Sequence, residues 1–223
     1  MITLTTVDHK KIAADVYTVS ETKEWVIYVH MMPSTRGSWR SLATCLQEKG
    51  IAGLAIDLRG HGESDGGPEG YHSFDDKEHQ ASINDIDAAV AYCKLQGVRE
   101  RNIILIGASI GANLVLQYIT EHSELRIAIL LSAGLNYRGV AVMPIIQKLN
   151  TDQRICLVSS EDDTVQSEME KNADENRAIF AAIPEGIEKK LVIYEQGGHG
   201  THMFETKEQP RLVEVVEQFV QGY

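Results

Sequence analysis

A serine lies between two glycines in the segment Gly107-Ala108-Ser109-Ile110-Gly111. The β-branched run at residues 103–106 predicts a strand before it, and the apolar stretch at residues 110–120 predicts a buried helix after it. A sharp strand-to-helix turn of this G-x-S-x-G type lifts the serine hydroxyl above the sheet, beside helix N–H groups that favour developing negative charge. Ser109 is therefore a candidate nucleophile. The alternative interpretation is a glycine-rich junction with Ser109 as a helix N-cap.

A serine hydroxyl is a weak nucleophile until a base takes its proton. His199 lies among glycines in Gly197-Gly198-His199-Gly200, directly after a predicted strand at residues 191–194. Open α/β sheets place their sites at the carboxyl ends of strands, so His199 is the predicted base. The alternative for His199, and the favoured interpretation of His202, is an exposed loop histidine. The two histidines have no companion carboxylate cluster at metal-binding spacing, so no metal site is expected.

A carboxylate is needed to hold the tautomer of the base and to stabilise its imidazolium. Glu161, Asp162 and Asp163 follow a predicted strand at residues 155–159, again at a carboxyl end. Composition alone does not choose among these three acids, and two of them are expected to be solvated turn residues, whichever one is functional.

Alternating strands and helices must position these side chains. Strands are predicted at residues 2–6, 12–19, 25–30, 51–57, 103–106, 127–131, 155–159 and 191–194. Helices are predicted at residues 39–50, 73–97, 110–120 and 167–182, and from Pro210 onward. Capping boxes are predicted to open two of them, Ser73 with Asp76 and Ser167 with Glu170. This alternation indicates a mostly parallel twisted sheet with an N-terminal antiparallel hairpin and helices on both faces, formed by residues 1–223 as a single domain.

These motifs together resemble the α/β-hydrolase superfamily, among its small serine esterases, over nearly the whole chain. The order serine, acid, histidine is the one that the superfamily uses. The run Asp57-Leu58-Arg59-Gly60-His61-Gly62-Glu63-Ser64 is similar to its D-x-R-G-x-G-x-S loop, in which Arg59 and His61 are expected to shape the turn. The resemblance implies Asp163 as the acid, with Asp162 as runner-up and Ser160 in the usual glycine position.

The resemblance also implies two backbone N–H donors for the tetrahedral oxyanion. One belongs to Ile110, the residue after the nucleophile. The other is expected at Met32, in a His30-Met31-Met32-Pro33 segment where relatives usually carry H-G-x, so Met31 departs from the pattern. The side chains of Met31 and Met32 are also expected to form part of the apolar wall of an acyl pocket. No cofactor is needed for this chemistry.

Composition restricts the remaining classes of function. The net charge of −11 disfavours nucleic-acid and membrane-surface partners. No apolar run approaches the length that spans a bilayer, and no signal peptide is recognised. Three widely spaced cysteines, Cys45, Cys93 and Cys156, form no disulfide framework and favour a reducing, cytoplasmic location.

The expected function is hydrolysis of small carboxylic esters through an acyl-enzyme. About twenty residues, 134–153, replace the larger cap of many relatives and predict a minimal cap made of a loop and one short helix, which favours short or medium acyl chains. Thioesters and lysophospholipids are alternatives, as are C–C bond cleavage and acyl transfer to an acceptor other than water. The alternative from another class is a non-catalytic small-molecule-binding protein with this fold.

Overall fold

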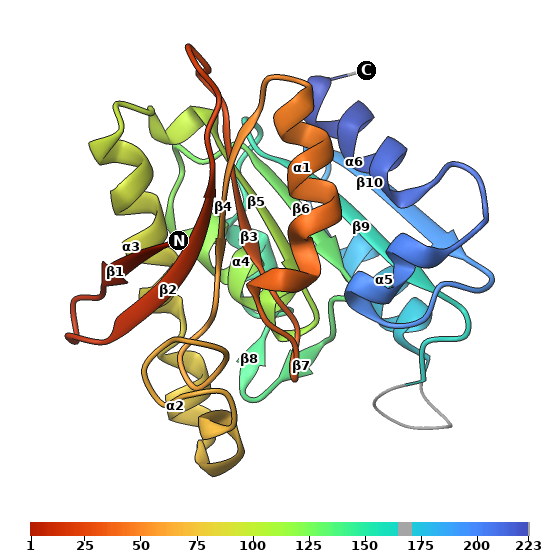
Figure 1. The fold of residues 1–223 in the computed structure, drawn as a ribbon. Coiled ribbons are helices and arrows are strands. Elements are labelled where there is room, and N and C mark those ends of the chain that lie inside the picture. Colours follow the sequence, from red (N-terminus) through yellow and green to blue (C-terminus); the bar gives the residue numbers. More distant parts are fainter. Residues whose placement is uncertain (165–170, 223) are drawn as a thin grey trace.

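An eight-stranded sheet runs through the middle of the molecule, whose residues 1–164 and 171–222 are described by a computed structural model (Figure 1). Its strands stand in the order β1-β2-β4-β3-β5-β6-β9-β10. The bounds of the strands are β1 Ile2–Thr5, β2 Lys11–Tyr17, β3 Trp25–Val29, β4 Ala52–Ile56, β5 Ile103–Ala108, β6 Ile127–Leu131, β9 Arg154–Ser160 and β10 Glu188–Tyr194.

Strand direction follows the predicted pattern. The pairs β1–β2 and β2–β4 are antiparallel, and all pairs from β4 to β10 are parallel. The central strands β3, β4 and β5 are buried along their whole length. Uninterrupted apolar runs suit strands that have both faces covered, which explains why these segments do not alternate with polar residues.

Helices cover both faces of the sheet. Two cores result, one formed with α1 and α6 and the other with α3, α4 and α5. Along β5, Ile104 and Ile106 point into the first core, whereas Ile103 and Leu105 point into the second. The bounds of the helices are α1 Arg40–Glu48, α2 Asp76–Gln80, α3 Ile83–Leu95, α4 Ile110–Glu121, α5 Asn172–Ala182 and α6 Leu212–Gln221. The predicted α/β-hydrolase architecture is confirmed.

One predicted helix start is wrong. The capping box lies at Asp75 and Glu78 instead of Ser73 and Asp76, and it opens the short helix α2. The chain then turns before α3 begins at Ile83, so one expected helix is two. The carboxylate of Asp75 accepts a bond from the Glu78 N–H, which makes it the better cap. The other predicted capping box, Ser167 with Glu170, lies outside the described residues.

The segment at 134–153 forms a small structure of its own. Its two-residue strands β7 (Asn136–Tyr137) and β8 (Val140–Ala141) pair as an antiparallel hairpin, and a short 3₁₀ turn, Ile146–Lys148, follows. The hairpin was not predicted, because two-residue strands carry no readable periodicity. Figure 1 shows it beyond the lower edge of the sheet.

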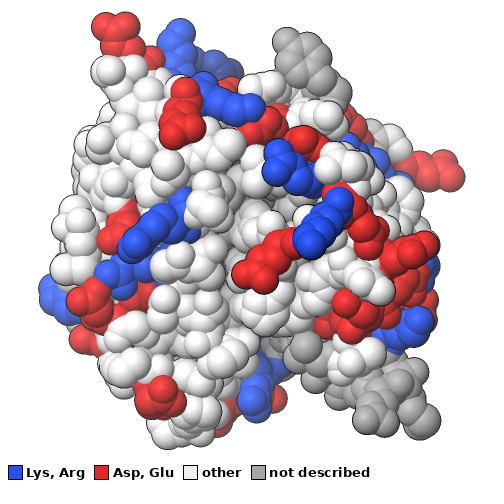
Figure 2. All heavy atoms as spheres, turned by 45° about the vertical axis from the view of Figure 1, so that its right-hand side comes forward, with Lys and Arg blue, Asp and Glu red and all other residues white. Residues whose placement is uncertain are grey.

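Acidic and basic side chains lie in scattered mixed groups on the face that includes α6 (Figure 2). Figure 2 shows them interspersed there, with no continuous Lys and Arg area among the described residues drawn on that face. No helix in the described parts of the chain has the length and apolar character needed to cross a membrane.

Candidate active site

Ser109 occupies a strained turn between β5 and α4. Its backbone has φ 54° and ψ −122°, a region that L-residues rarely adopt and that costs on the order of 1–3 kcal/mol. A Cβ at Gly107 would collide with the Gly111 carbonyl, and a Cβ at Gly111 would lie 2.5 Å from the Val29 carbonyl oxygen. Both glycines are therefore sterically required, which is the physical content of the motif.

Asp163 and His199 meet at the carboxyl edge of the sheet. Asp163 follows β9, His199 follows β10, and both are more than nine-tenths buried. His199 Nδ1 lies 2.9 and 2.8 Å from the two Asp163 carboxylate oxygens. A neutral imidazole that donates from Nδ1 presents its Nε2 lone pair to a partner, as a general base must.

Asp162 has a different task. Its Oδ1 accepts bonds from the Gly197 and Gly198 N–H groups at 3.0 and 2.9 Å and from the Ser160 hydroxyl at 2.6 Å. Burial opposes ionisation, yet these three donors keep the pKa of Asp162 below its usual value. Asp162 therefore anchors the loop that carries His199, and Asp163 contacts the imidazole itself. Ser160, in the usual glycine position, contributes one of the donors.

Ser109 and His199 lie on adjacent segments. A Cβ added at Gly200 would lie 3.3 Å from the Ala108 side chain and 2.6 Å from Met31 Sδ, so the histidine loop packs directly on the elbow. Within the described residues, no hydrogen bond joins Ser109 to His199.

The loop after β3 is shaped by a buried histidine. Leu58 N–H donates to His30 Nε2 at 2.9 Å, so the neutral ring carries its proton on Nδ1 and donates to the Met31 carbonyl, also at 2.9 Å. Burial, with the neighbouring His61, lowers the pKa of His30 to about 3. The Met31 carbonyl also accepts from the Ser34 N–H at 2.8 Å, which closes a tight turn.

The two predicted oxyanion donors lie where the loop after β3 meets the start of α4. The Met32 and Ile110 N–H groups donate to no residue that the structure describes. Gly111 brings the start of α4 against the carbonyls of Val29 and His30, where its added Cβ would lie 2.5 and 2.6 Å away. Unpaired N–H groups on adjoining segments are what an oxyanion site requires.

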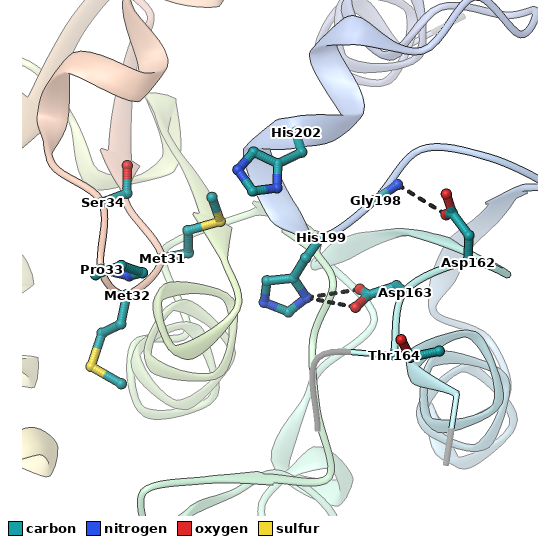
Figure 3. Close-up of a pocket in the computed structure, with 10 residues that line it drawn as sticks. All are labelled: Met31, Met32, Pro33, Ser34, Asp162, Asp163, Thr164, Gly198, His199 and His202. Carbon is teal, nitrogen blue, oxygen red and sulfur yellow. Dashed lines mark hydrogen bonds and ion pairs between the residues drawn. The ribbon is translucent and has the colours of Figure 1, made fainter. Parts of the chain in front are cut away.

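A cavity of about 630 Å³ opens beside the histidine. Met31, Met32, Pro33 and Ser34 line one side, and the residues following β9 and β10 line the other (Figure 3). His202 lies in the 3₁₀ turn Gly200–Glu205 and is exposed at this cavity (Figure 3); its exposure was predicted, whereas the loop expected there is a short turn. Ser109 is not among the described residues that line it; it lies nearly buried, with 7% of its surface exposed.

The glycine-rich loop after β4 is a structural support. Asp57 is fully buried and accepts from the Arg36 backbone and guanidinium and from the Glu63 N–H. Arg59 is held between Asp8 and Asp85 by several hydrogen bonds. Arg59 thus shapes the turn, as predicted. Across the described residues no three His, Cys, Asp or Glu side chains gather as a metal site.

Three polar residues near His199 were missed by the sequence reasoning: Ser132, Tyr137 and Asn172. Ser132 directly follows β6, and a position at the carboxyl end of a strand is the same sequence signal that indicated His199. Tyr137 belongs to the unpredicted hairpin, and no sequence signal pointed to it.

Comparisons with known proteins agree with this fold. The chain is 30% identical over 118 residues to the non-heme chloroperoxidase CPO-A1 of Kitasatospora aureofaciens, a match that covers 50% of this chain and 39% of that protein. The matches to curated relatives thus span less than half of those proteins' length.

Solved structures superpose over the whole chain. The esterase PF2001 of Pyrococcus furiosus has a TM-score of 0.79 at 18% identity, covering 100% of this chain and 89% of its own. Est1E of Butyrivibrio proteoclasticus, solved with ferulic acid bound, has a TM-score of 0.73 at 17% identity and covers 100% and 97%. At 17% and 18% identity, the similarity to these structures shows that this chain has the same fold.

The match to a family model is broader than those to the curated relatives. The model described as serine aminopeptidase, S33, matches residues 20–155, which include the loop after β3, the glycine-rich loop and the turn that carries Ser109. With the strained Ser109 turn and the sheet order in place, this chain belongs to the serine aminopeptidase S33 family of α/β-hydrolases.

Proposed function

We propose that this chain is a serine hydrolase that cleaves small carboxylic esters with Ser109, His199 and Asp163. The observation that carries the proposal is the buried His199–Asp163 pair, bonded through Nδ1, on a loop that packs against the elbow of Ser109. A serine beside such a pair is the arrangement that acyl transfer uses on several unrelated folds. The esterase names of two structural neighbours point the same way.

The reaction follows from the roles of these groups. His199 Nε2 takes the proton of Ser109 as its oxygen attacks the ester carbonyl. The N–H groups of Met32 and Ile110 donate to the oxyanion. The imidazolium, stabilised by Asp163, then protonates the leaving alcohol, and a water molecule repeats the sequence on the acyl-enzyme. No cofactor takes part.

The cavity supports small or medium acyl chains as substrates. Its volume of about 630 Å³ is in the range that holds one small organic ligand. Its Met31, Met32 and Pro33 side is apolar, and the cap formed by residues 134–153 is a single short hairpin and turn. A thioester or lysophospholipid would use the same groups, and the net charge of −11 argues against an anionic polymer as partner.

We also propose a subcellular location from the state of the cysteines. Cys93 and Cys156 are buried, and all three cysteines are free thiols, which suits a reducing compartment. We therefore place the reaction in the cytoplasm. The test is an activity assay under reducing and under oxidising conditions. We expect full activity with all three thiols reduced and no gain on oxidation. Activity only after oxidation would contradict the proposed location.

The test is hydrolysis of p-nitrophenyl esters of increasing acyl length. We expect turnover that is best on short or medium chains and that falls at least about a thousandfold in Ser109→Ala. The control is Ser73→Ala, which should leave turnover unchanged. Ser73 is an exposed serine at the end of the 3₁₀ turn Gly70–Ser73, after the glycine-rich loop. A folded wild-type protein that hydrolyses none of the esters, or a Ser109→Ala variant that keeps the activity, would refute the proposal and favour a binding protein.

A further inference from the structure

Tyr137, on β7 of the short hairpin, reaches the predicted general base. Its ring lies edge-to-face with the His199 imidazole, with ring centres 6.4 Å apart and planes at 79°. This geometry is a favourable one for aromatic pairs. Asp163 holds His199 only at Nδ1, so the carboxylate fixes one atom of the ring, and a neighbouring ring adds a second restraint on how the imidazole turns.

Buried polar groups hold Tyr137 itself. Its hydroxyl lies 3.3 Å from the Ser132 carbonyl oxygen, to which it donates, and it accepts from Asn172 Nδ2 at 3.2 Å. Asn172 also donates to the Ala133 carbonyl at 2.9 Å and accepts from the Ser159 hydroxyl at 2.7 Å. The Asn172 N–H donates to the Asp163 carbonyl at 3.1 Å, so the same residue supports the acid and the tyrosine.

Ser132 links this network to the histidine loop. Its side-chain oxygen accepts from the Gly200 N–H at 2.8 Å, and the residue is fully buried. Its φ of 50° is unusual for a residue with a side chain, and such strain persists only where the surroundings impose it. Ser132 therefore restrains the residue next to His199 while its carbonyl restrains Tyr137.

The helix of the nucleophile clamps the same hairpin. Asn113, on the first turn of α4, donates from Nδ2 to the carbonyls of Gly134 and Val140 at 2.9 and 2.8 Å. Its Oδ1 accepts from the Gly134 N–H at 3.0 Å, and its own N–H donates to Ser109 O. Asn113 thus ties both the segment before β7 and strand β8 to the helix that follows Ser109. The ring of Tyr137, between these two points, packs against His199.

We infer that the β7–β8 hairpin aligns the general base with the nucleophile and that Tyr137 is the positioning residue that does so. This inference rests on the proposed roles of Ser109 and His199. The minimal cap then acts on catalysis, through the orientation of His199, more than on substrate binding. A small misplacement of a catalytic group costs up to roughly a hundredfold in rate, so the effect is measurable.

The experiment compares Tyr137→Ala, Tyr137→Leu and Tyr137→Phe with wild type and with Asn136→Ala, an exposed neighbour on the same strand. Circular dichroism first checks that each variant is folded. Four quantities are then measured: kcat and KM on the best p-nitrophenyl ester, the rate at which a fluorophosphonate labels Ser109, and the proton resonance of the His199 Nδ1–H bonded to Asp163.

We expect Tyr137→Ala and Tyr137→Leu to lower kcat and the labelling rate by about 10–100-fold, with KM within about twofold. The Nδ1–H resonance should broaden or disappear in both. Tyr137→Phe keeps the ring but loses its hydroxyl bonds to Ser132 and Asn172, so its kcat should lie between that of Tyr137→Ala and that of wild type. Asn136→Ala should match wild type.

Two results would overturn the inference: wild-type kcat, labelling and resonance in Tyr137→Ala and Tyr137→Leu, or a rise in KM alone, which would make Tyr137 a substrate wall. Wild-type protein with neither hydrolysis nor labelling would instead refute the proposed function. In that case the resonance, which needs no substrate, still decides whether Tyr137 orients His199: an unchanged resonance in the variants overturns the inference, and a lost one supports it.

Discussion

Acid should destabilise this protein through His30, and the size of the effect follows from its surroundings. The ring is fully buried and neutral, with Nε2 accepting from Leu58 N–H and Nδ1 donating to the Met31 carbonyl. A proton added at Nε2 would replace an acceptor with a donor facing the Leu58 N–H. Burial, with the nearby His61, accordingly lowers the pKa of His30 to about 3.

Below its usual pKa of about 6.5, histidine is protonated in the unfolded chain, whereas His30 in the folded chain stays neutral until the pH nears 3. The unfolded state therefore binds more protons between these values, so stability is full above pH 6.5 and falls as the pH is lowered through this window. At about 1.36 kcal/mol per unit, His30 alone lowers the free energy of unfolding by about 2.7 kcal/mol between pH 7.5 and 4.5.

Urea unfolding at pH 7.5 and 4.5 measures this loss in wild type and in His30→Gln. Glutamine offers an acceptor near the position of Nε2 but does not titrate, and His61 remains in both proteins. We expect the stability difference between the two pH values to be smaller by about 2–3 kcal/mol in the variant. The control, His72→Gln at an exposed site, should keep the wild-type difference. Equal pH dependence in wild type and His30→Gln would refute the reasoning.

Three further predictions concern the supports of the site. Asp163→Asn should lower kcat by about 10³–10⁴-fold because the amide favours the wrong histidine tautomer, whereas Asp162→Asn should cost far less because that residue only anchors the loop; steady-state kinetics of both variants separate these roles, and equal losses would contradict them. Gly111→Ala should destabilise the fold and abolish activity because its Cβ would lie 2.5 Å from a carbonyl oxygen of β3; a Tm close to that of wild type would refute the steric argument. Arg59→Met should lower the free energy of unfolding in urea by about 3–5 kcal/mol because it leaves the buried Asp85 without its charge partner. A loss below about 1 kcal/mol would contradict this expectation.

The sequence predicted the parts of this molecule that local chemistry dictates. The glycines at 107 and 111 imply the elbow because no other residue fits there, and the apolar runs imply buried strands because both of their faces are covered. The helix start near Ser73 was misplaced because two overlapping capping patterns compete there, and side-chain geometry at Asp75 decided between them.

The rest of the site depends on contacts between distant segments. The choice between Asp162 and Asp163 depends on which carboxylate meets His199, 36 residues further along the chain from Asp163, and no local pattern encodes that contact. Tyr137 likewise acquires its position from Ser132, Asn172 and the clamp by Asn113. Such networks are visible only once the strands lie side by side.

The most direct test of the central claim is to trap the acyl group on its serine. Wild-type protein mixed with a p-nitrophenyl ester and quenched in acid within the first turnover should carry the acyl mass on the peptide that contains Ser109. Ser109→Ala should carry none, and in Asp163→Asn the acyl group should form and disappear slowly. Ester turnover without any acyl group on Ser109, or an acyl group on another residue, would contradict the account.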